Sequence, residues 1–252
     1  MKKLTLIASF LFISVILLAG PPYDTDDPEP VSFRSWEFYL SSHSNYLRNF
    51  SQGTLPHFEV NYGVIKNVQL HLIVPLAFYD EYGGKMNYGI GDIEVGVKFR
   101  FIQETKYIPQ VGIFPLCEIP AGSPDKELGN GTMQYFLPLW IQKSFGDKWL
   151  TYGGYGYWIN PGKSDQNRSY VGWQAQYQLT EKVSIGAELY DIIPDNGGND
   201  ARFNIGCVVD LNDQNHLLFS AGRSFNNDTS FQCYVGYLFT ISKEEKTFSK
   251  KI

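Results

Sequence analysis

The sequence predicts an all-β protein, an antiparallel transmembrane β-barrel of about twelve strands with short periplasmic turns and longer extracellular loops. Three observations lead to this prediction. Apolar and polar residues alternate with a period of two in segment after segment, short and long connections follow one another in turn, and the chain opens with an export signal. We expect the barrel to cover residues 33–241 of the 252-residue chain.

The N-terminus has the layout of a secretory signal peptide, which we expect over residues 1–20. Residues 1–3 are Met-Lys-Lys, a short basic start, and an apolar stretch follows over residues 4–19. A transmembrane anchor is the alternative, because this stretch is near the lower length limit for a spanning helix. No basic cluster follows it and the chain turns acidic instead, which favours export.

Residues 21–32 form an acidic, proline-rich segment between the signal and the first strand. Its acidic part, from Asp24 to Glu29, is suited to attract cations. The interpretation that we favour is structural: this segment is either a periplasmic lead-in to the barrel or a partial plug of its lumen.

The alternation is cleanest from Val68 to Phe78, where an apolar residue occupies every second position and Gln69 and His71 stand between the first of them. A period of two places all of these apolar side chains on one face of a strand. No segment combines a 3.6-residue period with helix caps, so strands are expected throughout. The same alternation returns at residues 93–101, 171–179, 203–211 and 231–241.

The connections between strands are predicted to alternate in length. Short turns are predicted at residues 66–67, 105–106, 146–148, 180–182 and 212–215. Longer segments rich in Gly, Asn, Asp and Ser occupy residues 44–55, 80–90, 120–132, 160–168 and 193–200, with a shorter one at 226–229. Strands of about ten residues, the length that crosses a bilayer when tilted, fill the intervals and place both chain ends on the side of the short turns.

A period of two gives a strand two faces without saying which face is inside. A soluble secreted barrel or sandwich with a dry interior is therefore an alternative, although a sandwich of so many long strands would be unusually large. Tryptophans near predicted strand ends favour lipid outside, because they suit an interfacial aromatic girdle. These tryptophans are Trp36, Trp149, Trp158 and Trp173.

Composition excludes two other classes of protein. The chain carries 21 Lys and Arg against 26 Asp and Glu, so it lacks the basic surface of a nucleic-acid-binding protein. After the N-terminus no apolar run of about 18 residues occurs, which argues against a bundle of membrane-spanning helices. The expected partners are instead outer-membrane lipids and small solutes.

The last predicted strand carries an insertion signal. Gly236, Tyr237, Leu238 and Phe239 place a glycine before alternating aromatic residues, a pattern that the barrel-assembly machinery reads in outer-membrane barrels. The chain continues beyond this strand, and residues 242–252 form a charged tail that we expect in the periplasm.

Several segments resemble one known family. The segments are residues 22–31 (PYDTDDPEPV) with the following Trp36 and Glu37, residues 55–63 (LPHFEVNYG), residues 70–72 and, most specifically, residues 136–162 (FLPLWIQKSFGDKWLTYGGYGYWINPG). They resemble the family called MetA-pathway of phenol degradation, a set of outer-membrane barrels. The resemblance covers nearly all of the chain after the signal, and it implies a barrel that passes small solutes, hydrophobic or aromatic ones included, across the outer membrane.

If the apolar positions face lipid, the alternate positions face the lumen. Charged groups there either pair across neighbouring strands and fill the interior, or form rings that select solutes in a narrow polar pore. A twelve-stranded barrel lies between filled eight-stranded barrels and open sixteen-stranded porins, so both interpretations stay open. The candidate lumen-lining residues are Glu37, His57, Glu59, His71, Asp92, Glu94, Lys98, Arg100, Glu188, Arg202 and Asp210.

We expect neither a catalytic site nor a cofactor. His57, Glu59 and His71 are of the residue types that bind zinc, but the predicted hairpin places His71 far along its strand from His57. An outer-membrane lipase would need a serine activated by a histidine, and nothing near His43 orients such a pair. The expected function is therefore passage of small solutes through a bacterial outer-membrane channel. The alternative is a structural or surface-exposed outer-membrane protein with an occluded lumen and no transport activity.

Overall fold

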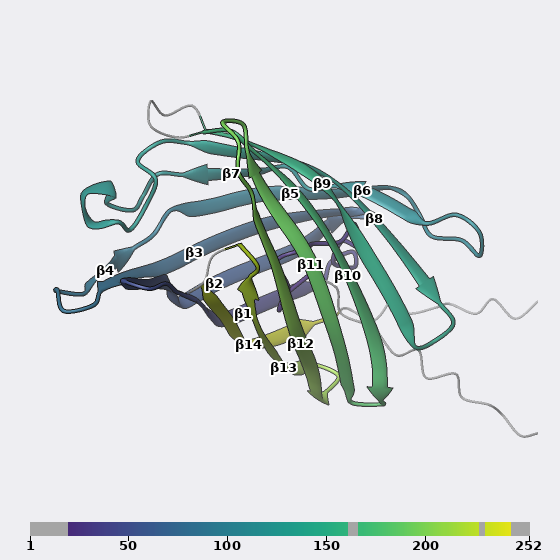
Figure 1. Cartoon of the computed structure of the whole chain (residues 1–252). Helices are drawn as coiled ribbons and strands as arrows, with labels where there is room; N and C mark the ends of the chain where they lie inside the picture. Colours follow the sequence, from purple (N-terminus) through teal and green to yellow (C-terminus); the bar gives the residue numbers. More distant parts are fainter. Residues whose placement is uncertain (1–19, 161–165, 227–229, 243–252) are drawn as a thin grey trace, which may run out of the picture.

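The computed structural model describes residues 20–160, 166–226 and 230–242, which form one closed antiparallel β-barrel (Figure 1). The signal peptide expected over residues 1–20, apart from Gly20, lies outside the described residues, as does the charged tail apart from Ser242. In the described part of the chain, no helix is long and apolar enough to span a membrane.

Fourteen strands form one sheet, and their bounds follow the alternating segments of the sequence. The strands are β1 (Trp36–Tyr46), β2 (Phe50–Ile65), β3 (Val68–Glu81), β4 (Asn87–Ile90), β5 (Ile93–Ile102), β6 (Gln110–Ile113), β7 (Leu116–Ile119), β8 (Gln134–Phe145), β9 (Trp149–Ile159), β10 (Arg168–Thr180), β11 (Val183–Pro194), β12 (Asp200–Asn212), β13 (Asn215–Ser224) and β14 (Phe231–Ile241). One short 3-10 helix, η1 (Pro124–Lys126), lies in the connection between β7 and β8.

The ring closes because the first and last strands pair. Strand β1 lies between β2 and β14, with Trp36 opposite Ile241. On the far side, β3 pairs with both β4 and β5, and β8 pairs with both β6 and β7. Strands β4 and β5 therefore share one position in the ring, and β6 and β7 share another. The barrel thus has 12 strand positions, as the sequence predicts.

Strand β10 shows which face is inside. Gln174 and Gln176 are 0% exposed, whereas Trp173, on the alternate positions, is 50% exposed. The glutamines therefore point into the barrel and the apolar side chains point out, and the same arrangement recurs around the ring with Leu40, Phe58, Leu72, Val97, Leu137, Ile205 and Val235 exposed. An apolar exterior around a polar interior contradicts the alternative of a soluble barrel with a dry core and is the arrangement of a transmembrane β-barrel.

The connections alternate less regularly than the sequence predicts. Strands β1 and β2 extend into the predicted loop at residues 44–55 and leave only residues 47–49 as the connection. Conversely, residues 103–109 separate β5 from β6, where a short turn was expected at residues 105–106. Polar residues in the first case continue the register of the β1–β2 pair, with Asn45 opposite Gln52 and Tyr46 opposite Ser51, so polarity alone did not mark a loop.

The acidic segment before β1 lies inside the barrel, and not in a lead-in outside it. Its hydrogen-bond partners come from strands all around the ring, including β3, β5, β11 and β13. A segment can reach all of these strands only from the lumen (Figure 1, purple). Of the two expectations for residues 21–32, the partial plug is the one that matches this arrangement.

Candidate functional site

The functional site of a barrel is its lumen, and here the lumen is built jointly by the wall and by residues 20–35, which we call the lumen segment. The backbone N–H groups of Asp24 and Thr25 donate hydrogen bonds to the Glu188 carboxylate at 2.9 and 2.8 Å. On the opposite side of the ring, the Val31 N–H donates to Gln69 at 2.9 Å. These contacts satisfy backbone groups that would otherwise be buried without partners.

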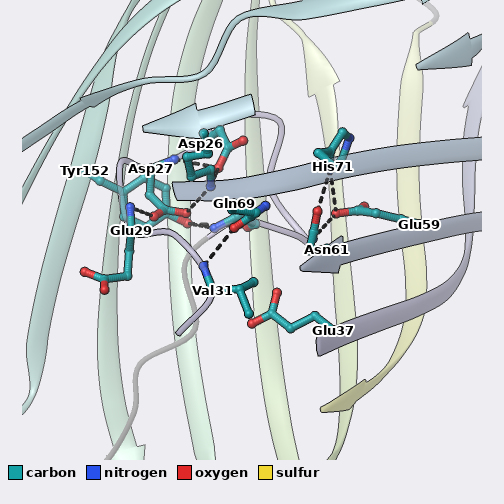
Figure 2. A network of polar contacts seen from close by, with 12 residues as sticks. Asp26, Asp27, Glu29, Val31, Glu37, Glu59, Asn61, Gln69, His71 and Tyr152 are labelled. Carbon is teal, nitrogen blue, oxygen red and sulfur yellow. Dashed lines mark hydrogen bonds and ion pairs between the residues drawn. The ribbon is translucent and has the colours of Figure 1, made fainter. Parts of the chain in front are cut away.

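Ion pairs hold the acidic part of the lumen segment against β5. The Lys98 Nζ lies 2.9 Å from Asp26 and 3.4 Å from Asp27, and Asp27 is 1% exposed. The Arg100 guanidinium pairs with Glu29 at 2.5 Å. Figure 2 shows Asp26, Asp27 and Glu29 gathered beside the β-strands of the wall. Lys98 and Arg100, like Glu188, are therefore candidate lumen-lining residues that bind the lumen segment itself.

Glycines in the wall leave room for the lumen segment. A Cβ atom added to Gly172 would lie 2.5 Å from the Thr25 hydroxyl, and one added to Gly206 would lie 3.0 Å from the Tyr23 ring. Both separations are shorter than ordinary van der Waals contact, so larger residues at these positions would displace the segment.

A second polar cluster surrounds His71 on β3. Its Nε2 lies 2.9 Å from Glu94. Its Nδ1 lies 2.6 Å from the Asn61 side-chain oxygen and 3.7 Å from Glu59 (Figure 2). The Asn61 amide nitrogen donates to Glu59, which fixes the orientation of the amide. Both ring nitrogens of His71 therefore face oxygen atoms that can accept hydrogen bonds.

The metal ligands considered for this region are not brought together. His71 is held by Asn61 and Glu94, while His57 instead faces the Thr54 hydroxyl at 3.0 Å. The hairpin pairs His71 with Asn61 and His57 with Pro75, which separates the two imidazoles along the strands. Among the described residues, no group of three or more His, Cys, Asp or Glu side chains could hold a metal ion.

The remaining candidate residues have different surroundings. Glu37 accepts a hydrogen bond from the Tyr39 hydroxyl at 3.1 Å. Asp92 accepts from the backbone N–H groups of Gly122 and Asn130, so it anchors the connection between β7 and β8. The other contacts are Arg202 with Asp200 at 2.6 Å and with Gln232 at 2.8 Å, and Asp210 with His216 at 2.6 Å. Most candidate charges are thus paired with partners inside the barrel.

An aromatic cavity of about 340 Å³ lies in the half of the lumen away from the short turns. Its apolar lining is Phe114, Leu116, Phe136, Trp140, Trp158, Tyr170, Tyr190 and Ile192, and Asp24 and Asp26 of the lumen segment also border it. The rings pack against one another, with Phe136 and Trp158 stacked at 4.8 Å between centroids. This cavity corrects the placement of Trp158 in an outer aromatic girdle, because its ring packs with the inner cluster.

This cavity was not predicted from the sequence because β8 is apolar on both faces. Phe136 and Trp140 are buried, and the outward Leu137 and Leu139 are equally apolar, so a period of two gives no contrast. One signal was available: Phe136 and Trp140 share the parity of Gln134 and Gln142, the polar residues of the same strand. The acidic residues of the lumen segment were also absent from the candidate lining.

A larger cavity of about 900 Å³ lies on the other side of the lumen segment. Residues of the short turns, such as Asp147 and Asp213, border it together with Glu37, Glu59 and His71. Asp24 and Asp26 border both cavities. The lumen segment therefore separates a wide polar vestibule at the short-turn end from the aromatic cavity at the opposite end.

These features define a class: a 12-stranded transmembrane barrel with a lumen divided by its own N-terminal segment. A family model described as "Putative MetA-pathway of phenol degradation" matches residues 49–234. The match spans well over half of the chain, and the protein belongs to this family, which confirms the resemblance seen in the sequence.

Solved structures share the fold at low sequence identity. The COG4313 outer membrane channel from Pseudomonas putida F1 aligns with a TM-score of 0.68 and 13% identity, over 87% of this chain and 100% of that chain. A NanC porin aligns with a TM-score of 0.60 and 8% identity, over 80% of this chain and 98% of that chain. A KdgM porin gives a TM-score of 0.59 and 10% identity, over 81% and 99% of the two chains. Among curated proteins, none matches the sequence.

Proposed function

We propose that this protein is a bacterial outer-membrane channel that passes small hydrophobic or aromatic solutes. Its short turns face the periplasm, its longer connections face outward, its exterior contacts outer-membrane lipids, and its last strand is read by the barrel-assembly machinery. The fold shared with an outer membrane channel and with porins supports the channel role. The family, whose description refers to phenol degradation, supports an aromatic solute.

The observation that carries the proposal is the aromatic cavity. A volume of about 340 Å³ accommodates a small organic molecule, and ligand sites for such molecules are lined by apolar and aromatic side chains with a few polar groups. Phe136, Trp158 and Tyr190 offer ring faces and edges, while Arg202 and Gln232 at the border offer polar contacts. A solute would partition into this cavity from outside and continue past the paired charges of the wall, among them Glu59, Glu94 and Arg202, which would set its selectivity.

A second candidate function has an observation in its favour. The lumen segment fills the middle of the barrel and pairs with the wall, as expected of a structural or surface-exposed protein with an occluded lumen. The two functions differ in whether any solute or ion passes the lumen segment.

The test compares two neighbouring residues of β8 that point to opposite faces. Phe136→Gln places an amide in the aromatic cavity, whereas Tyr135→Gln replaces an aromatic ring by the same amide on the exterior. In cells that lack other porins, we expect the protein to raise uptake of radiolabelled phenol and toluene. Phe136→Gln should reduce that uptake several-fold, and Tyr135→Gln should leave it near the level of the unaltered protein.

Planar-bilayer recordings of the purified protein complete the test. A channel gives discrete conductance steps for small ions. Phe136→Gln should retain these steps because glutamine is smaller than phenylalanine and does not narrow the lumen. Absence of both conductance and solute uptake would overturn the channel proposal and leave the occluded barrel. If the protein conducts ions but both variants take up the solutes equally, the channel role would stand and the proposed aromatic solute would be overturned.

A further inference from the structure

The buried acidic cluster of the lumen segment has fewer cations than carboxylates. Asp26 and Asp27 both form their ion pairs with Lys98, while the nearby Arg100 is engaged by Glu29. Two carboxylates therefore share one ammonium group among the described residues. A buried carboxylate without a compensating cation is costly, so a second positive charge at this place would stabilise the cluster.

The position of that missing charge is occupied by Gly20. A Cβ atom built on Gly20 would lie 3.6 Å from a carboxylate oxygen of Asp26 and 3.6 Å from one of Asp27. The backbone nitrogen of Gly20, bonded to the same Cα, donates to the Tyr152 hydroxyl at 3.3 Å. Gly20 and Tyr152 are both buried within the barrel. Gly20, whose nitrogen cleavage would free, thus lies close to the two carboxylates.

We propose that the mature chain begins at Gly20 and that its α-ammonium group is the second cation of the Asp26–Asp27–Lys98 cluster. A signal peptidase hydrolyses the Ala19–Gly20 peptide bond: the oxygen of one water joins the Ala19 carbonyl carbon, and the nitrogen of Gly20 leaves as an amine. The amine takes up the proton that the new Ala19 carboxylic acid releases, so the products are a carboxylate on the leader and an ammonium on Gly20.

The sequence around this bond is compatible with the proposed cleavage. Ala19, the residue directly before the proposed cut, is small and ends the apolar stretch, whereas Leu17 stands where an A-x-A-like site has its second small residue. Cleavage one residue later, after Gly20, is the boundary that a signal peptide over residues 1–20 implies. It would remove the nitrogen that lies beside Tyr152 and leave Pro21 as the terminus. The proposed cleavage site and the proposed second cation therefore both depend on Gly20.

An ammonium at Gly20 can make the contacts that the site offers. It has three N–H donors, whereas the amide nitrogen of an uncleaved chain has one. One donor can remain on the Tyr152 hydroxyl while the others face the Asp26 and Asp27 carboxylates. Removal of the leader would thus stabilise the lumen segment inside the barrel after export, because the second cation forms only when the Ala19–Gly20 bond is cleaved.

The first experiment determines the N-terminus of the protein purified from the outer membrane of an expressing cell. Intact mass and N-terminal sequencing should give a chain that starts at Gly20. A start at Pro21, or retention of the leader, would overturn the proposal. This measurement is independent of transport, so failure of the proposed solute leaves it unaffected.

The second experiment asks whether the ammonium belongs to the cluster. Two chains that lack the leader are refolded in detergent, one starting at Gly20 and one with a single serine before Gly20, and their termini are checked by mass. Hydrogen exchange at Tyr23 and Thr25 should be at least tenfold faster in the extended chain. Asp27→Asn removes one negative charge but keeps an oxygen for the Glu29 N–H.

In the Asp27→Asn background the effect of the added serine should shrink to less than threefold, because the second cation is then no longer needed. This comparison is a double-mutant cycle, so it isolates the coupling between the terminus and Asp27. Equal effects of the serine in the two backgrounds, or no effect in either, would overturn the role assigned to the ammonium group.

Discussion

At the scale of single residues, the interior is organised by carboxylates that accept hydrogen bonds from the lumen segment. Glu188, on β11, is 2% exposed and accepts from the N–H groups of Asp24 and Thr25. It also accepts from the side chain of Asn204. A carboxylate is suited to this place because its two oxygens accept hydrogen bonds, and the neighbouring groups, two backbone N–H groups and the Asn204 amide, are donors.

Glu188→Gln should loosen the lumen segment. The substituted amide turns one of its two polar atoms into a donor, which would face backbone N–H groups, and a hydrogen bond to a charged group contributes about 1.5–3 kcal/mol. We expect hydrogen exchange at Asp24 and Thr25 to accelerate by about 10- to 100-fold. Glu181→Gln, in an exposed turn, is the control and should change nothing. Unchanged exchange in Glu188→Gln would mean that the segment is held mainly by its ion pairs.

At the scale of elements, sequence patterns predicted strands with a polar inward face and failed where that contrast was absent. β10 was predicted together with its two faces because glutamines alternate with apolar residues. The inward aromatic residues of β8 were not recognised from the sequence, because the outward residues of this strand are also apolar. The sequence left two positions open for the lumen segment, a lead-in outside the barrel and a partial plug. Its position depends on Lys98, Gln69, Glu188 and Ser220, which belong to four different strands.

Deleting residues 21–32 should open the barrel without unfolding it. The segment contributes no strand to the ring, in which β1 pairs directly with β2 and β14. We expect the single-channel conductance to rise several-fold, because the vestibule and the aromatic cavity then join. The shortened chain should keep its heat-modifiable migration on gels.

A matched variant separates the length of the segment from its contacts. Replacing residues 21–32 by a Gly-Ser stretch of equal length keeps a chain in place but removes its ion pairs and its backbone-anchoring side chains. Its conductance should fluctuate between closed and open levels. If the deletion conducted like the unaltered protein, the segment would not be the constriction.

At the scale of the whole molecule, the barrel is stable only in an environment that matches its two faces. Val235, at the middle of β14, is 51% exposed, and Ile241, at the end of the same strand and on the same face, is 42% exposed. In water these apolar surfaces would drive aggregation. In a bilayer they contact lipid tails, which are equally apolar, so their exposure has no free-energy cost.

A charge on this exterior should therefore act according to its depth. Val235→Arg should lower the free energy of unfolding by about 2–4 kcal/mol, and Ile241→Arg by about 0–1 kcal/mol, because only the first lies near the bilayer midplane. Denaturant unfolding in liposomes measures both. Equal losses for the two variants would contradict a membrane-spanning β14.

The lumen segment also has an electrical consequence. Between Gly20 and Ser32 it carries Asp24, Asp26, Asp27 and Glu29 and no lysine or arginine, and the counter-charges Lys98 and Arg100 stay on the wall. The chain continues from this segment into the wall at β1, at the short-turn end. A transmembrane voltage acts on each charge that crosses it with about 2.3 kcal/mol per 100 mV. A potential that is positive at the short-turn end therefore pulls these carboxylates toward that end, and the opposite potential pushes them inward. An applied voltage thus acts directly on the contacts that hold the lumen segment to the wall.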